Sequence, residues 1–223
     1  MLVNREQLQS ALSLAVRVMD KKSVMPILDN VLIKDGKVIA TNLDQSIEVD
    51  IDIQGTETVC TTGSLLLGII SRLTGDETEI LETDNGYLID GKKIRLPKTD
   101  PEQYPSTPDM TIQGNLQFDA DFLKQGLQVA LLGTNEERAI STDKSNFVYF
   151  SGDKETAYLV STDGNRMAKT ETAYAGDEFD YVIPLASART LVSAIHGTVS
   201  ISEDGNHLVF CMEGIKYAFR KTT

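Results

Sequence analysis

The side chains that most often carry out reactions are sparse in this chain, and none of them falls in a catalytic pattern. The two histidines, His196 and His207, are isolated from any other candidate ligand or base. Asp44, Asp163 and Asp204 could act as paired carboxylates in acid–base catalysis. The last two precede glycine, however, and Asp-Gly is typical of a turn. Since phosphate-loop, zinc-protease and serine-hydrolase motifs are also missing, we predict a protein that is not an enzyme, with no cofactor and no metal site.

Cysteine content and hydropathy indicate where such a chain would work. Cys60 and Cys211 are too few for a disulfide framework or a zinc site, which fits a reducing cytoplasm. We expect both thiols to be buried in strands. No apolar run approaches the length of about 18 residues that a membrane-spanning helix needs. Residues 1–5 lead directly into a helix without the apolar segment of a signal peptide. The sequence therefore predicts a soluble, cytoplasmic protein without a membrane partner.

The basic residues are unevenly distributed. A net charge of −12 argues against an ordinary surface nucleic-acid binder, which would be basic overall. The four helices predicted below nevertheless carry a net charge of +2, which leaves −14 on the rest of the chain. Their charged residues, with the capping residue Asp119 included, are Arg5, Arg17, Arg72, Lys124 and Arg189 against Glu6, Asp119 and Asp121. Such segregation favours helices that approach a polyanion, with chance as the alternative.

Four segments have the apolar spacing of amphipathic helices, namely residues 4–19, 64–73, 120–132 and 185–196. Asp119 is expected to cap the third helix. Pro184 is suited to the first position of the fourth. The polar face of the first helix is narrow and basic at both ends, and it carries Arg5, Gln9, Ser13 and Arg17.

The order of elements is repeated along the chain. Arg5-x-x-Leu8-Gln9 matches Lys124-x-x-Leu127-Gln128 at an offset of 119 positions, and the turns at residues 85–86 and 204–205 match at the same offset. Each half reads as helix, strands, helix and three strands, with residues 47–53 as a single strand whose acidic face lies outside. We predict an α+β fold of two tandem domains, each with two helices packed on antiparallel sheet. The domains are residues 1–110 and 111–223, joined by an extended, proline-rich linker at residues 97–114.

Four short segments, in order along both halves, are similar to motifs of the bacterial DNA sliding clamp, the DNA polymerase III beta subunit family. They are Pro26-Ile27-Leu28-Asp29-Asn30, Thr41-Asn42-Leu43-Asp44-Gln45-Ser46-Ile47, Tyr104-Pro105 with Pro108, and Thr162-Asp163-Gly164-Asn165-Arg166-Met167-Ala168. The resemblance implies DNA-clamp domains whose helices face a central hole. In that family six domains close a ring around duplex DNA.

The bacterial clamp has three domains per chain and forms dimers, whereas this chain has two. Six domains then require three copies, so the resemblance implies a head-to-tail homotrimer similar to the clamps of eukaryotes, archaea and some phages. The basic residues would face the phosphates without reading sequence. The DNA-facing candidates are Arg5, Arg17, Lys21, Lys22, Arg72, Lys124, Arg138 and Arg189. The alternative for each is a solvated helix face, and for Arg138, in a loop, an internal ion pair.

The resemblance also implies a pocket for short apolar peptides of partner proteins. Its residues here are Thr162, Gly164, Asn165, Arg166 and Met167, with Asn165 in place of the family's histidine. A third domain normally supplies the other wall, so a neighbouring subunit or the linker would have to replace it. The alternative is a simple hairpin turn.

The function implied is that of a DNA polymerase processivity factor, loaded onto double-stranded DNA by a clamp-loader ATPase. The alternative is a clamp-like interaction protein, encoded by a phage or plasmid, that binds clamp partners without encircling DNA.

Overall fold

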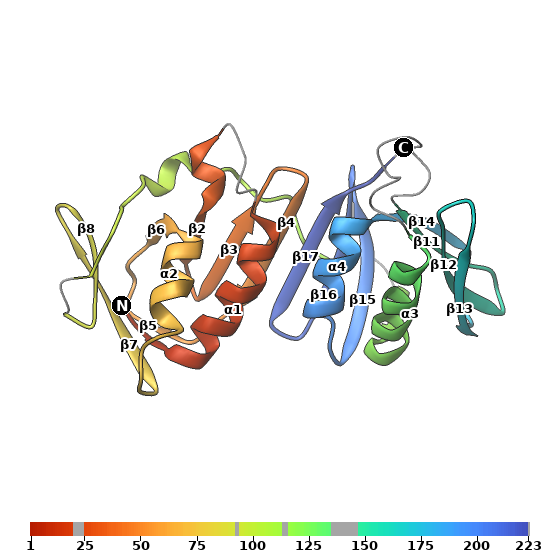
Figure 1. The fold of residues 1–223 in the computed structure, drawn as a ribbon, viewed down its shortest axis with the longest axis horizontal. Coiled ribbons are helices and arrows are strands. Elements are labelled where there is room, and N and C mark those ends of the chain that lie inside the picture. The colour runs from red at the N-terminus through yellow and green to blue at the C-terminus, as the bar shows by residue number, and fades with distance from the viewer. Residues whose placement is uncertain (20–24, 92–93, 113–115, 135–146, 223) are drawn as a thin grey trace. The chain divides into compact units, whose positions relative to one another are not determined.

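The computed structural model describes residues 1–19, 25–91, 94–112, 116–134 and 147–222. These residues form two compact units (Figure 1). Unit 1 comprises Met1–Asp109 together with Gly214–Tyr217, and unit 2 comprises Met110–Glu213 together with Ala218–Thr223. Predicted Lys21, Lys22 and Arg138 lie outside the described residues.

Unit 1 contains two helices and two antiparallel sheets. Its helical elements are α1 (Arg5–Val18), α2 (Gly63–Ile70) and the 3-10 turns η1 (Pro26–Asp29) and η2 (Pro101–Gln103). Its strands are β1 (Leu2–Asn4), β2 (Asn30–Lys34), β3 (Lys37–Thr41), β4 (Gln45–Asp50), β5 (Ile53–Gln54), β6 (Val59–Thr62), β7 (Glu77–Thr83), β8 (Gly86–Ile89) and β9 (Arg95–Leu96). One sheet has the order β4-β3-β2-β6, and the other has the order β5-β1-β7-β8-β9. The two helices contact each other, and α1 packs on β3 and β4 (Figure 1).

Unit 2 repeats this arrangement. Its helices are α3 (Ala120–Leu132) and α4 (Leu185–Ala194). Its strands are β10 (Leu116–Asp119), β11 (Phe147–Gly152), β12 (Thr156–Thr162), β13 (Met167–Ala173), β14 (Phe179–Pro184), β15 (Thr198–Asp204), β16 (His207–Met212) and β17 (Ile215–Arg220). The first three residues of β17 are assigned to unit 1. The order β13-β12-β11-β14 matches β4-β3-β2-β6, and β10-β15-β16-β17 matches β1-β7-β8-β9. The predicted α+β fold with tandem repeats of two helices on antiparallel sheet is confirmed.

The first helices of the two units have the same kind of N-cap and bury corresponding residues. The side chain of Asn4 accepts a hydrogen bond from the amide of Gln7, and that of Asp119 accepts one from the amide of Asp121. The sequence prediction of Asp119 as a cap is therefore right. Residues that follow the two caps at equal intervals are buried in both helices: Leu8, Ala11, Leu12 and Ala15 in α1, and Leu123, Gly126, Leu127 and Ala130 in α3.

These caps align the two helices at an offset of 115 positions, so the single predicted offset of 119 is wrong for them. A slip of four residues is about one helical turn and leaves the apolar pattern in place, which is why the sequence match was misleading. Between Thr41 and Thr162 the offset is already 121, because the connections in unit 2 are longer. The counterpart of Lys124 is consequently Gln9 rather than Arg5.

Two local predictions also differ from the structure. Pro184 is the cap of α4 rather than its first helical residue. The predicted strand 47–53 divides into β4 and β5, because the chain passes from one sheet to the other at Ile51 and Asp52. The side chain of Gln7 fixes this crossing: it accepts from the amide of Asp52 and donates to its carboxylate, both at 2.9 Å.

The predicted linker is not uniformly extended or superficial. It contains η2, capped by the side chain of Asp100. Tyr104 follows, with a buried ring and a hydroxyl that accepts from the amide of Thr41 and donates to the carbonyl oxygen of Asn30. Burial raises the pKa of this hydroxyl far above its ordinary value. Hydrogen bonds therefore hold the linker to unit 1 at Tyr104 and again at Thr107, whose hydroxyl donates to Glu48.

Candidate nucleic-acid interface and partner site

Three of the basic residues predicted to face DNA have exposed or half-buried side chains on helices. Arg17 is exposed in the last turn of α1, Lys124 is half-buried on α3, and Arg189 is exposed on α4. Cations near the end of a helix also interact favourably with its dipole, so the position of Arg17 has a structural benefit of its own. These three residues place positive charge on the polar faces of three helices.

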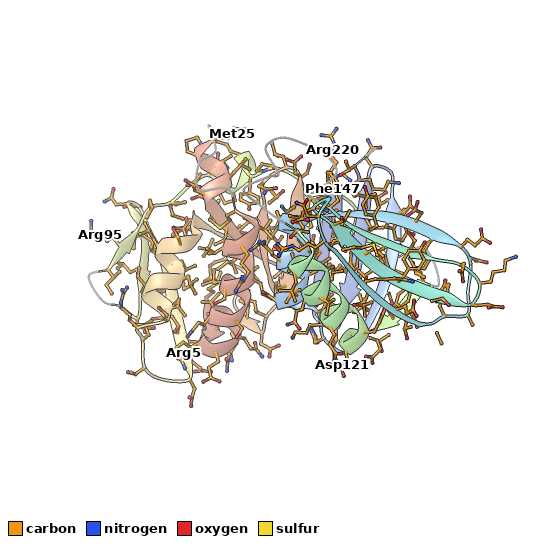
Figure 2. The ribbon with its side chains drawn as sticks, turned by 45° about the vertical axis from the view of Figure 1, so that its right-hand side comes forward. Arg5, Met25, Arg95, Asp121, Phe147 and Arg220 are labelled. Carbon is orange, nitrogen blue, oxygen red and sulfur yellow. The ribbon has the colours of Figure 1, made fainter. Side chains whose placement is uncertain are left out.

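Arg5, by contrast, is engaged by its own unit. Its guanidinium donates to the carbonyl oxygen of Gly75 at 2.6 Å and to the side-chain oxygen of Gln9 at 3.0 Å, and it lies 3.3 Å from Glu6. Only 17% of its side chain is exposed. Figure 2 shows Arg5 at the start of α1, where it ties the helix to the segment before β7. Arg5 contributes charge at this end, but most of its donors are already used.

Arg72 is also turned back onto its own helix. It lies two residues beyond the end of α2, and its guanidinium donates to the carbonyl oxygen of Gly68 at 2.8 Å. The last carbonyls of a helix lack partners within it, so a basic side chain there stabilises the helix end. The side chain remains exposed, and its other donors can still approach an anion.

The predicted acidic outer face of residues 47–53 is partly neutralised. Ile47, Val49 and Ile51 are buried as predicted. Glu48, on the other face, pairs with the ammonium of Lys37 at 2.8 Å and accepts from the hydroxyl of Thr107 in the linker. The hydrogen bond from Lys37 to Glu48 is the main cause that raises the pKa of Lys37, and burial of the lysine has the opposite effect. The strand is therefore less acidic toward solvent than its sequence predicts.

The predicted partner site lies on the hairpin between β12 and β13. The hydroxyl of Thr162 donates to the carbonyl oxygen of Arg166 at 2.7 Å and accepts from the amide of Gly164. The carboxylate of Asp163 accepts from the amides of Asn165 and Arg166, both at 3.0 Å. Gly164 has φ +85°, a conformation that suits glycine. The turn brings all five predicted residues into one short structure.

Arg166 connects this hairpin to helix α3. Its guanidinium donates to the carbonyl oxygen of Thr134 at 2.9 Å, just after the helix, and its Nε lies 3.2 Å from Asp163, whose side chain is only 5% exposed. Gly133 lies so close to Ala168 that a Cβ at residue 133 would fall 2.9 Å from the Ala168 Cβ. Leu132 and Met167, which precede these two contacting residues, are 72% and 69% exposed. The result is an exposed apolar surface beside an ion pair in which Asp163 is buried and Arg166 is exposed.

Sequence reasoning missed Leu132 and Thr134. The signal for Leu132 was available, because it is an apolar residue outside the stripe that α3 buries. Thr134 contributes through its backbone carbonyl, which no residue pattern reveals.

Unit 1 contains a second copy of the same hairpin turn, between β3 and β4. Thr41 donates to the carbonyl oxygen of Gln45 and accepts from the amide of Leu43, and the side chain of Asn42 accepts from the amides of Asp44 and Gln45. Every one of these bonds has its counterpart in residues 162–166. Leu43 takes the place of Gly164, with φ +76° and 52% of its surface exposed. The hydrogen-bonded frame is shared, whereas the residue at its tip differs.

The remaining candidates for chemistry have structural surroundings. Both ring nitrogens of His196 lie 2.9 Å from backbone carbonyl oxygens, those of Ala194 and Glu213. Cys60 is buried in β6, and burial raises the pKa of its thiol to about 11. Cys211 lies in β16 but is only partly buried, so the prediction of a buried thiol is right for Cys60 and wrong for Cys211. Within the described ranges, no group of three or more His, Cys, Asp and Glu residues could hold a metal ion. The helices described there are all too short or too polar to cross a membrane.

Comparison with known proteins places this architecture among the DNA sliding clamps. Residues 1–108 match the family described as DNA polymerase III beta subunit, N-terminal domain. The beta sliding clamp of Synechococcus elongatus is 25% identical over 228 residues, which cover 92% of this chain and 60% of that protein. The DNA polymerase III beta subunit of Thermotoga maritima superposes with a TM-score of 0.86 over 99% of this chain and 63% of that one, at 20% identity. The Helicobacter pylori beta clamp bound to a DNA ligase peptide gives 0.82, at 18% identity, over 100% of this chain and 66% of that one.

The fold is thus that of a bacterial sliding clamp, built from tandem clamp domains. The match of residues 1–108 to the N-terminal-domain family of the DNA polymerase III beta subunit agrees with this fold. The chain spans about 60% of the length of the first of these relatives.

Proposed function

We propose that this protein is a DNA polymerase processivity factor, a clamp that encircles duplex DNA and tethers replication proteins to it. The observation that carries this proposal is the pair of contacting helices, packed on antiparallel sheet, that occurs once in each unit of a sliding-clamp fold. The role is that of a non-catalytic, cytoplasmic accessory subunit. It needs no side chain arranged for bond making or breaking.

Contact with DNA is proposed to come from basic side chains on the helices. Arg17, Lys124 and Arg189 are the main contributors, and Arg5, Arg72, Lys21, Lys22 and Arg138 complete the set. Contacts of this kind hold phosphates without reading bases, and few of them per helix leave the clamp able to slide. Because each contact displaces counterions, the direct affinity for DNA falls steeply with salt. Retention on circular DNA is topological and does not depend on that affinity.

A ring made from this chain is proposed to be a head-to-tail homotrimer. Six clamp domains close the ring of the sliding-clamp family, and three copies of the domains at residues 1–110 and 111–223 supply that number. Heterologous contacts of this type close when the rotation between copies fits. Opening and closing around DNA is assigned to a clamp-loader ATPase.

Partner proteins are proposed to dock a short apolar peptide at the β12–β13 hairpin. The exposed side chains of Met167 and Leu132 supply apolar surface, and Thr162, Gly164, Asn165 and Arg166 shape the turn beside it. The Helicobacter pylori clamp that this fold resembles was solved with a DNA ligase peptide. The second wall of the pocket is assigned to a neighbouring subunit or to the linker.

The experiment that tests the proposal measures retention on DNA. The full chain is loaded onto nicked circular DNA with a clamp loader, washed in high salt, and released by cutting the circle. A trimer by light scattering, together with release only after linearisation, supports the processivity factor. A stable monomer at micromolar concentration, with no retention on the circle, contradicts it. That result would favour the second candidate, a clamp-like interaction protein of phage or plasmid origin that captures clamp partners without encircling DNA.

A further inference from the structure

Unit 2 contains a cavity of about 680 Å³ that the proposed clamp function does not use. It lies between the start of β10, the connection from β13 to β14, the start of β14 and the end of β15. Small-molecule and peptide pockets typically measure about 300 to 1,000 Å³. The cavity is therefore large enough for a few residues of a peptide rather than for a single ion.

One wall of the cavity is aromatic and rigidly held. The rings of Tyr174 and Phe179 meet edge to face with centroids 5.5 Å apart, and Tyr181 follows at 5.4 Å from Phe179. Behind them, the buried ring of Phe118 stacks on Tyr174 at 5.5 Å. Aromatic pairs at these separations are attractive, so the wall is an extension of the core of unit 2.

The loop that carries this wall is shaped by the same tyrosine. The Tyr174 hydroxyl donates to the carbonyl oxygen of Asp177 at 2.9 Å. A Cβ at Gly176 would lie 2.3 Å from that hydroxyl, so the loop can close over the ring only with glycine there. The hydrogen bond to Asp177 and the close approach at Gly176 therefore shape this wall of the cavity.

The rim of the cavity is acidic. Asp177, Glu178 and Glu203 line it, and no basic residue is among the lining residues that the structure describes. Burial, with the nearby Glu203 carboxylate, raises the pKa of Tyr181 to about 12, and burial with Asp177 raises that of Tyr174. At one edge of the rim the ammonium of Lys221 pairs with Glu203, which is one example of a cation bound by these carboxylates. An anion or a nucleic-acid backbone would be repelled here.

We propose that this cavity binds a short peptide segment of a partner protein through an arginine or lysine side chain. The faces of tyrosine and phenylalanine attract such a cation, and the carboxylates of Asp177 and Glu178 pair with it. Arginine fits best, because its planar guanidinium stacks on a ring while it donates to carboxylates. The site is separate in chemistry from the apolar surface of Met167 and Leu132, and it does not depend on the proposed processivity function.

The test compares two fluorescein-labelled peptides, Gly-Leu-Arg-Leu-Gly and the same peptide with citrulline, the neutral isostere of arginine. Binding to the full chain is followed by fluorescence anisotropy. We expect the arginine peptide to bind at least about tenfold more tightly, because citrulline removes the charge and keeps the shape. We expect the double variant D177N/E178Q to lose most of this difference. Equal binding of the two peptides would overturn the proposal.

A matched control separates the cavity from the general acidity of the chain. Glu213 is exposed in the turn before β17, away from the cavity, and E213Q should bind the arginine peptide as the unchanged chain does. A loss in E213Q equal to that in D177N/E178Q, or displacement of the peptide by an equal concentration of spermidine or Mg²⁺, would show non-specific attraction and overturn the proposal. The substituted carboxylates are exposed, so thermal unfolding by circular dichroism should be unchanged and confirm that both variants are folded.

Discussion

The guanidinium of Arg166 donates to the carbonyl oxygen of Thr134 at 2.9 Å, which joins the β12–β13 hairpin to the end of α3. The same guanidinium lies 3.2 Å from Asp163, whose carboxylate also holds the amides of the turn. Arg166 thereby fixes the position of Met167 relative to the helix that carries Leu132. If peptides dock on this apolar surface, Arg166 acts as a positioning residue for them.

We therefore expect R166Q to weaken peptide docking more than it weakens folding. More than half of the Arg166 side chain is exposed, so its loss should lower the free energy of unfolding by only about 1 kcal/mol. Affinity for a labelled leucine- and phenylalanine-rich pentapeptide should fall about tenfold. K154Q, in the exposed β11–β12 turn, is the matched control and should change neither quantity. Undiminished peptide affinity in R166Q would remove the hairpin from the proposed partner site.

Two glycines within helices should respond to alanine in opposite ways. A Cβ at Gly126 would lie 2.4 Å from a methyl of Leu159, which is buried in β12, so G126A should lower the free energy of unfolding by about 1–2 kcal/mol. At Gly68 the nearest atom is the Arg72 guanidinium at 3.7 Å, so G68A should raise it by about 0.5–1 kcal/mol through helix propensity. Urea unfolding of both variants checks this. A stabilised G126A would mean that α3 can move away from β12.

The tips of the two matching hairpins allow a test of backbone strain. Nothing lies within 4 Å of a Cβ at Gly164, so the loss expected in G164L, about 1–2 kcal/mol, comes from the left-handed backbone alone. Leu43 already adopts that conformation, and we expect L43G to be no less stable than the unchanged chain. Thermal unfolding measures both. A large loss in L43G would instead show that the leucine side chain packs against its surroundings.

Reversal of charge on the helices tests the proposed DNA contacts. We expect R17E/K124E to reduce polymerase stimulation and to flatten the dependence of DNA binding on salt, because fewer counterions are released. The fold should be unaffected, since Arg17 is exposed and Lys124 half-buried. K154E carries the same kind of change outside the helices and should leave stimulation unchanged. Equal loss in both variants would point to overall charge rather than to the helix faces.

The ion pair between Lys37 and Glu48 predicts a dependence of stability on alkaline pH. The hydrogen bond from Lys37 to Glu48 raises the lysine pKa above its ordinary value of 10.5. Its contribution is fully present below that value and is lost as pH rises through the raised pKa, because the folded state holds the proton more tightly. Urea unfolding of the unchanged chain and K37Q, between about pH 9 and pH 11.5, should show their difference shrinking as pH rises. A constant difference would contradict this account.

Much of the fold could be predicted because it depends on local signals. The four helices follow from apolar spacing, and the tandem repeat is visible as an order of elements. The short strands β1 and β10 were missed because they have only three and four residues, and their place is set by pairing with β7 and β15 rather than by their own sequence. The crossing at Asp52 depends on Gln7, forty-five residues earlier, and no local pattern contains that contact.

The candidate sites show a similar division. Residues 162–167 were found because they are contiguous and form one turn. Leu132 and Thr134 reach that turn only through tertiary contacts. Charge at Arg5 was visible in the sequence, but its engagement with Gly75 and Gln9 was not. The DNA-facing set as a whole stays a prediction.

The matching hairpins of the two units have a practical consequence for protein engineering. The backbone of each turn is held by bonds among its own five residues, so an exchange of residues 41–45 with 162–166 changes mainly their contacts outside the turn, such as that of Arg166 with Thr134. A recognition sequence transplanted from one half of the molecule to the other would keep its backbone shape. The two turns thus share one hydrogen-bonded backbone frame, whereas the residues at their tips, Leu43 and Gly164, differ.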